Sequence, residues 1–230
     1  MKTFRWILFG VILILFVISM VDLAFAIRSY SGGTSLHSQL KSFSLTENLL
    51  FELGRSKGYN GLDNSLSLYH WWRFLLLSGI SMTILHVMWL LNMRVHQSRQ
   101  LAGVAFLLVG LGAFHSYGLG LYPFDSSYPQ FYTFWERMAA AYAFGAVFTG
   151  FAMYVEPDCS RKHAIAWWIA GSMGLIQVAV LKWGPAFWSS SDLLLFHSLF
   201  EKLTVLAYVL VWLMHLNLRY RRLRGNRERG

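Results

Sequence analysis

The chain has 230 residues, of which 56% are hydrophobic and 17% aromatic, whereas only 13% are charged. A soluble globular domain is about 25% charged, so this chain has too little polar surface to cover a water-soluble fold. Its single cysteine, Cys159, excludes an intramolecular disulfide scaffold. The composition therefore predicts an integral membrane protein.

The net charge of +9 at pH 7 does not by itself indicate nucleic-acid binding. Six of the 20 basic residues lie in the last twelve positions, directly after an apolar stretch. A basic segment at that place is attracted to anionic lipid by about 1 kcal/mol per charge. We therefore expect membrane lipids and no nucleic acid as partners, and a basic tail that anchors the topology.

Six stretches are apolar and long enough to cross a membrane as helices. A helix rises about 1.5 Å per residue, so about 20 residues span a hydrocarbon core of about 30 Å. The predicted spans are residues 6–27, 70–93, 101–122, 131–155, 163–183 and 193–217. All four prolines lie between these stretches, as unbroken helices require. The predicted fold class is all-α, an integral membrane bundle of six transmembrane helices.

The spans divide the chain into four segments. Residues 1–27 form a signal anchor and first transmembrane helix, residues 28–69 an external loop, residues 70–217 a five-helix transmembrane bundle, and residues 218–230 a cytoplasmic basic tail. The start also resembles a signal peptide with an Ala-x-Ala cleavage site, but its apolar region is longer than usual, which favours retention. In the loop, leucines at roughly helical spacing from Leu36 to Leu53 predict a helix on the membrane surface.

Lysine and arginine are concentrated in alternate connecting segments. Residues 1–5, 94–100 and 156–162 and the tail carry them, whereas residues 123–130 and 184–192 carry none. The positive-inside rule therefore places both termini in the cytoplasm. We expect a multi-pass protein of the plasma (inner) membrane.

Two of the predicted spans begin alike. Residues 131–138 (Phe-Tyr-Thr-Phe-Trp-Glu-Arg-Met) and 196–203 (Phe-His-Ser-Leu-Phe-Glu-Lys-Leu) are identical or similar in character at every position. Two explanations remain open: coincidence in an aromatic-rich chain, or a parallel repeat of helical hairpins that relates spans three and four to spans five and six.

Two short motifs lie at the ends of spans. Residues 120–125 (Gly-Leu-Tyr-Pro-Phe-Asp) follow a central span, and residues 198–202 (Ser-Leu-Phe-Glu-Lys) start the last one. On these motifs, residues 44–222 resemble the prokaryotic polytopic membrane protein family catalogued as domain of unknown function 998. The chain departs from the family pattern with Ser for Gly and Lys for Arg in the second motif, and it lacks the histidine that many relatives carry after the first. Because that family is uncharacterised, the resemblance implies a polytopic membrane architecture and no activity.

Ionisable residues gather at the predicted outer ends of the spans, where burial makes each of them costly. We expect them to form a polar cavity or charge network in the outer leaflet; they are His70, Arg73, His115, Asp125, Glu136, Arg137, His197, Glu201 and Lys202. Glu136 and Glu201 are each followed directly by a cation. Adjacent residues point about 100° apart on a helix, so each glutamate should pair with a cation from another span. The available partners are Arg73, Arg137 and Lys202.

A metal site is a weaker interpretation of the same region. The candidate ligands are His115, Glu136, His197 and Glu201. His197 and Glu201 are one helical turn apart and share a face, and imidazole and carboxylate are both zinc ligands. No dense histidine motif supports zinc, and no Walker, G-x-S-x-G, H-E-x-x-H or C-x-x-C motif occurs. The sequence therefore predicts no cofactor.

These observations favour a non-catalytic multi-pass plasma-membrane protein whose outer cavity binds lipid or a small anion, or only stabilises the bundle. The alternative is a membrane-embedded, metal-dependent lipid hydrolase of the ceramidase type. A transporter ranks third, because the spans lack the Pro and Gly interruptions that often mark substrate sites.

Reporter fusions test the predicted orientation. Fusions after Arg99, Lys162 and Arg229 should report a cytoplasmic location, and fusions near Asp125 and Ser190 an external one, because the basic segments stay inside. Reversal at two or more of these sites would contradict the predicted topology.

Overall fold

The computed structural model describes residues 2–228, which form helices and connecting turns without a β-strand. The six long helices are α1 (Lys2–Ser29), α2 (Ser65–Leu90), α3 (His96–Leu121), α4 (Tyr128–Val155), α5 (Arg161–Trp183) and α6 (Ser191–Glu228). Two short 3-10 turns, η1 (Leu50–Gly54) and η2 (Phe187–Ser189), lie in the connections. All six long helices contain a segment long and apolar enough to cross a membrane, which confirms the predicted fold class. The predicted repeat of hairpins stays a prediction.

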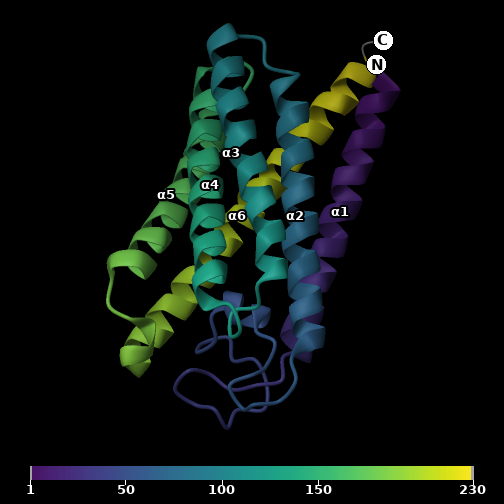
Figure 1. The fold of residues 1–230 in the computed structure, drawn as a ribbon. Coiled ribbons are helices and arrows are strands. Elements are labelled where there is room, and N and C mark those ends of the chain that lie inside the picture. Colours follow the sequence, from purple (N-terminus) through teal and green to yellow (C-terminus); the bar gives the residue numbers. More distant parts are fainter. Residues whose placement is uncertain (1, 229–230) are drawn as a thin grey trace.

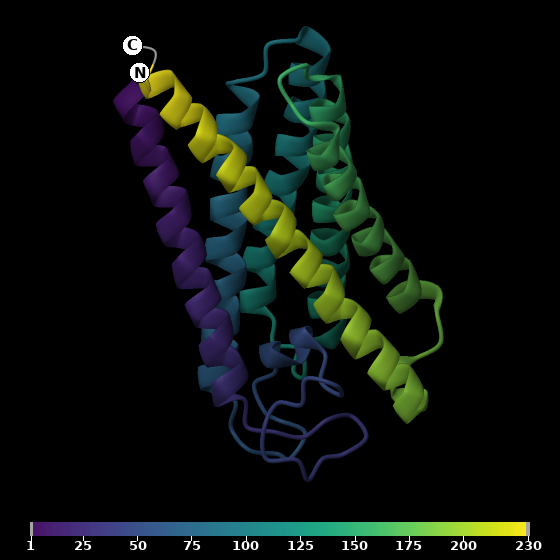
Figure 2. The ribbon, with the colours of Figure 1, turned by 180° about the vertical axis from the view of Figure 1, so that it is seen from behind.

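Helices α1 to α5 pack side by side in chain order (Figure 1). Helix α6 crosses this layer on a diagonal, so its C-terminal half meets α1 while its N-terminal half lies beside α5 (Figure 2). Phe16 and Trp212 stack where α1 and α6 meet, with ring centroids 3.7 Å apart. From this contact the two helices diverge toward the end of the bundle that holds residues 30–64. Both chain ends lie at one end of the bundle, and residues 30–64 cover the opposite end, which we call the loop end.

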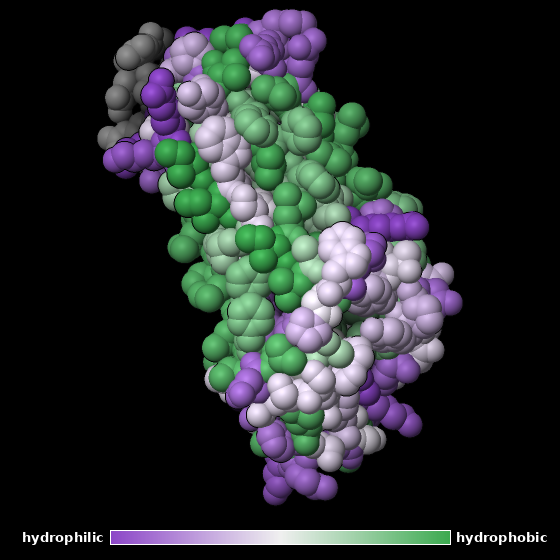
Figure 3. All heavy atoms as spheres, turned by 90° about the vertical axis from the view of Figure 1, so that its left-hand side faces the viewer, coloured by the Kyte–Doolittle hydropathy of each residue, from purple (hydrophilic) through white to green (hydrophobic). Residues whose placement is uncertain are grey.

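The outside of the bundle is apolar over most of its length. Large hydrophobic side chains such as Leu107 and Phe114 are more than half exposed, at 68% and 64%. Polar residues gather toward the two ends (Figure 3). Helices with an apolar belt of this kind satisfy their backbone groups internally and can face lipid, so the architecture fits a multi-pass membrane protein.

Residues 30–64 do not form the surface helix expected between Leu36 and Leu53. They follow a series of turns, and η1 is their single helical element. Leu49, Leu50 and Leu53 are buried in one apolar cluster with side chains of α2 and α4, among them Trp71. These leucines pack against the bundle instead of forming a surface helix. The divergence of α1 and α6 leaves apolar surface at this end, and the leucines cover it.

Several helix boundaries also differ from expectation; α3, for example, begins at His96 rather than at residue 101. Helix α2 begins at Ser65 rather than at residue 70. Helix α6 continues to Glu228, so the expected tail is helical as far as it is described, and its last two residues lie outside the described range.

Small residues bring α4 and α5 into close contact. A Cβ atom added at Gly171 on α5 would lie 2.9 Å from the Ala143 carbonyl oxygen of α4. One added at Gly150 on α4 would lie 3.0 Å from the Ala164 carbonyl oxygen of α5. The two backbones therefore approach more closely than side chains would allow, as is common between membrane helices.

Gly171→Ala should lower the melting temperature of the detergent-purified protein, because α5 must move away from α4. Overpacking of this kind costs about 1–3 kcal/mol. Gly110→Ala on α3 is the matched control, since nothing lies within 4 Å of a Cβ added there. Equal melting temperatures for the two variants would show that the α4–α5 contact tolerates a methyl group.

Candidate functional site

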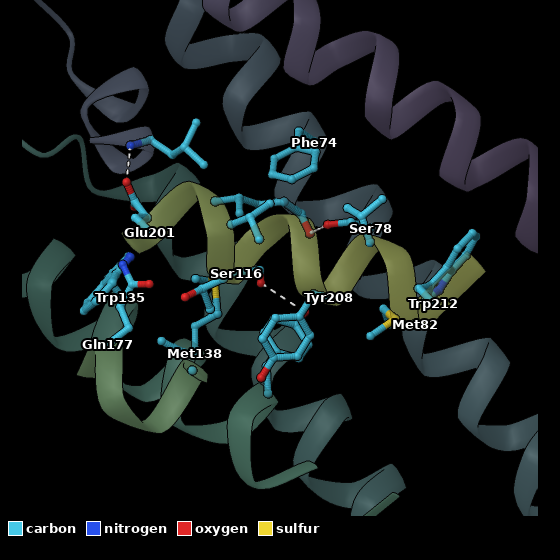
Figure 4. Close-up of a pocket in the computed structure, with 18 of the residues that line it drawn as sticks. Phe74, Ser78, Met82, Ser116, Trp135, Met138, Gln177, Glu201, Tyr208 and Trp212 are labelled. Carbon is cyan, nitrogen blue, oxygen red and sulfur yellow. Dashed lines mark hydrogen bonds between the residues drawn. The ribbon is translucent and has the colours of Figure 1, made fainter. Parts of the chain in front are cut away.

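The loop is held at the end of the bundle by side chains of α6. Glu201 accepts a hydrogen bond from the Leu50 backbone N–H at 2.5 Å, drawn as a dashed line in Figure 4. The Lys202 ammonium and the Ser198 hydroxyl both donate to the Asn48 carbonyl oxygen, at 2.6 Å and 2.9 Å. Helix α6 therefore binds the backbone of the loop directly. We call loop residues 48–54 the plug.

Glu52 is fully buried and organises the plug from within. One carboxylate oxygen accepts hydrogen bonds from the Asn48 amide at 2.7 Å and the Leu49 N–H at 3.0 Å. The other accepts from the Tyr59 hydroxyl at 3.0 Å. Burial raises the pKa of Glu52 to about 7, although these hydrogen bonds act in the opposite direction. Burial, followed by the Glu52 charge, also raises the pKa of Tyr59.

Asp125, in the connection between α3 and α4, fixes the loop from another side. Its carboxylate accepts hydrogen bonds from the Ser56 and Lys57 N–H groups, at 2.7 Å and 2.9 Å, and from the Ser56 hydroxyl at 2.9 Å. Partial burial acts to raise the pKa of Asp125, but these hydrogen bonds outweigh it and hold that pKa below its ordinary value. The predicted site residue Asp125 thus anchors the loop.

Two further groups of charged residues connect neighbouring helices. Asp22 on α1 is buried and contacts two residues of α2: His70 at 2.8 Å and Arg73 at 3.3 Å. Glu136 on α4 pairs with Lys182 at the end of α5.

Glu136 pairs with a cation from another span, as expected, but that cation is Lys182. The expected partners Arg73, Arg137 and Lys202 are wrong for both glutamates, and Glu201 binds a backbone N–H instead. Asp22 takes Arg73, Arg137 is exposed, and Lys202 turns to a loop carbonyl. The physical reason is that the loop returns to the bundle and supplies Glu201 with a backbone N–H.

The four metal-ligand candidates do not come together. His115 lies between the rings of Phe114 and Phe134, each with its centroid 5.6 Å away. His197 is hydrogen-bonded to the backbone of Pro185. Within residues 2–228, no group of three or more His, Cys, Asp or Glu side chains is placed to hold a metal ion. The metal-dependent hydrolase needed that convergence, so the geometry gives it no support.

A central cavity of about 210 Å³ lies inside the bundle, between α6 and the other helices (Figure 4). Its loop end is bounded by Leu50 of the plug and by Glu201. Most of the remaining lining is apolar and includes Phe16, Met20, Phe74, Leu75, Met138, Val205 and Val209. Of the nine predicted site residues, Glu201 lines this cavity and His197 lines a second one at the loop end.

The central cavity also receives several uncharged polar groups. Gln177 on α5 is 6% exposed and lines it. The Ser116 and Tyr142 hydroxyls lie 3.3 Å apart on its wall. Within residues 2–228, the buried hydroxyl of Tyr208 on α6 has no hydrogen-bond partner. The wall therefore offers a ligand a few hydrogen-bonding groups, the Gln177 amide among them.

Sequence reasoning missed Gln177 and Tyr208. Both lie in the interior of apolar spans, where no charge or motif distinguishes them from packing residues. A buried amide within a membrane span was the one available signal, because polar groups are costly there.

Comparisons of this chain with family models, curated proteins and solved structures found no match. The resemblance to the family of domain of unknown function 998 stays a prediction, and the site is interpreted from its own geometry.

Glu52→Gln should flatten the pH dependence of stability. A carboxyl group whose pKa is raised on folding, here to about 7, binds its proton more tightly in the folded state, so stability falls as the pH rises from its unfolded pKa toward 7. We expect the melting temperature of the parent protein to fall between about pH 5 and about pH 7.5, and that of Glu52→Gln to fall less.

The matched control is Asp63→Asn, which neutralises an exposed carboxylate of the same loop. This variant should keep the parental pH dependence. Identical pH profiles for the parent protein and Glu52→Gln would show that the Glu52 proton does not contribute.

Proposed function

We propose that this multi-pass membrane protein binds a lipid-like molecule in its central cavity. The ligand places an apolar chain along α1, α2 and α6, and a hydrogen-bonding group near Gln177 and Tyr208. The observation that carries this proposal is the apolar lining of the cavity, into which the Gln177 amide is placed as one of few polar groups. Apolar pockets with a few placed polar groups are the usual form of small-molecule sites.

The character of the lining favours an uncharged or weakly polar ligand over an anion. The lining residues in the described part of the chain include the Glu201 carboxylate and no lysine or arginine. An anion would approach a buried carboxylate without a cation to offset the repulsion. The sequence predicted either a lipid or a small anion as the ligand, and the lining of the cavity favours the lipid.

The bilayer is the proposed route of entry. Phe16 and Met20 of α1 line one side of the cavity, and Val205 and Val209 of α6 line another. These two helices diverge toward the loop end (Figure 2). A lipid chain would enter between them without crossing the polar ends of the bundle.

We assign the protein to the plasma membrane with both termini cytoplasmic, on the distribution of basic residues alone. In that orientation the plug covers the external end of the central cavity. The ligand would then be exchanged with the bilayer rather than with the external solution.

Val205→Trp tests the proposal, because the larger side chain fills the cavity. The protein is purified in mild detergent, and bound lipid is measured by native mass spectrometry and by extraction. We expect the parent protein to retain a lipid and Val205→Trp to lose most of it. Leu206→Trp is the matched control, since Leu206 is 51% exposed on the outer face of α6, and it should retain the parental amount.

A second variant addresses the polar contact. Gln177→Leu removes the amide and should weaken retention roughly fivefold, the value of about one hydrogen bond. Absence of retained lipid from the parent protein, or equal retention by both tryptophan variants, would overturn the proposal.

A further inference from the structure

A second cavity of about 190 Å³ lies at the loop end, between α4 and the connection from α5 to α6. Seven of its twelve lining residues are aromatic: Phe51, Phe124, Tyr128, Phe131, Tyr132, Trp135 and Trp188. We call it the aromatic pocket. Trp135 lines both this pocket and the central cavity, and so stands between them.

The rings form a continuous wall along α4. Tyr128, Tyr132 and Trp135 are about one turn apart and stack in order, with centroid distances of 5.9 Å and 6.1 Å. Phe51 of the plug extends this wall at 5.8 Å from Trp135, and Phe124 extends it at 5.2 Å from Tyr128. The faces of such rings carry partial negative charge, so each face turned toward the pocket attracts a cation without a carboxylate.

Two polar groups of the pocket lining have partners within the protein. The Tyr132 hydroxyl donates to the Leu181 carbonyl oxygen at 3.2 Å, and His197 is hydrogen-bonded to the Pro185 backbone. No lysine, arginine, aspartate or glutamate occurs among the described lining residues. Lys182, next to Leu181 in the chain, is paired with Glu136. A cationic ligand would therefore find no carboxylate partner in this lining.

We propose that the aromatic pocket binds a quaternary ammonium group, of the kind carried by choline compounds. Such a group has no N–H to be satisfied, and aromatic faces attract it directly. A primary ammonium has three N–H groups to satisfy when it loses its water, and the lining offers no carboxylate for them. Free choline compounds and choline lipids carry the same group, and the site is separate from the ligand proposed for the central cavity.

The test compares choline with ethanolamine, which differ by three methyl groups on nitrogen. Both are titrated into the full-length protein in a maltoside detergent, which contains no ammonium group, and binding is followed by ligand-observed NMR. We expect saturable binding of choline and binding of ethanolamine that is weaker by about tenfold or more, in line with the strength of a desolvated cation–π contact.

Two tryptophan variants test whether choline binds in the aromatic pocket. Trp188 lines the pocket and is 53% exposed, so Trp188→Leu should fold and weaken choline binding by about fivefold or more. Trp183 is 76% exposed and lies outside the lining, so Trp183→Leu should bind as the parent protein does. Melting temperatures verify that both variants are folded.

Experiments in nanodiscs distinguish a choline lipid from a free choline compound as the ligand. Competition of choline binding by phosphatidylcholine, but not by phosphatidylethanolamine, would identify a lipid head group as the ligand. Choline binding without such competition would identify a free solute. The proposal is overturned if the folded parent protein shows no saturable choline binding, if ethanolamine binds equally well, or if the two tryptophan variants bind alike.

Discussion

The hydrogen bond between the Glu201 carboxylate and the Leu50 backbone N–H determines the architecture of the loop end. A carboxylate buried in an apolar bundle is strongly destabilising unless hydrogen-bond donors surround it. Here the loop supplies the donor, and Lys202 and Ser198 bind the carbonyl group of Asn48 beside it. The plug is thereby drawn into the space that opens where α6 diverges from α1.

Both cavities depend on the position of this plug. Leu50 bounds the central cavity, whereas the next residue, Phe51, belongs to the wall of the aromatic pocket. Helix α6 also contributes to both cavities: Glu201 lines the central cavity, and His197 lines the aromatic pocket. Movement of the plug would therefore change both cavities together, although their linings differ in chemistry.

The buried carboxylates of the loop end all have hydrogen-bond donors or cations as partners. Asp22, Glu52 and Glu201 are all at least 95% buried, and each is bound by donors from another element or from the plug itself. Asp125 is more exposed and binds two consecutive backbone N–H groups. Glu201 and Asp125 thus fasten a loop of irregular backbone to the helical bundle, while hydrogen bonds within the loop, such as those of Glu52, define its shape.

The sequence by itself determined the six spans, since the length and apolarity of each helix are local properties. It also indicated that Glu136 and Glu201 lie near one end of the bundle. Their partners were decided by the tertiary structure, because Lys182 and the Leu50 N–H reach them only through the packing of α5 and the return of the loop. The leucines of the loop predicted a helix, but burial against α2 and α4 overrode that spacing. The central cavity lies beside the diagonal course of α6, which no local pattern in the chain encodes.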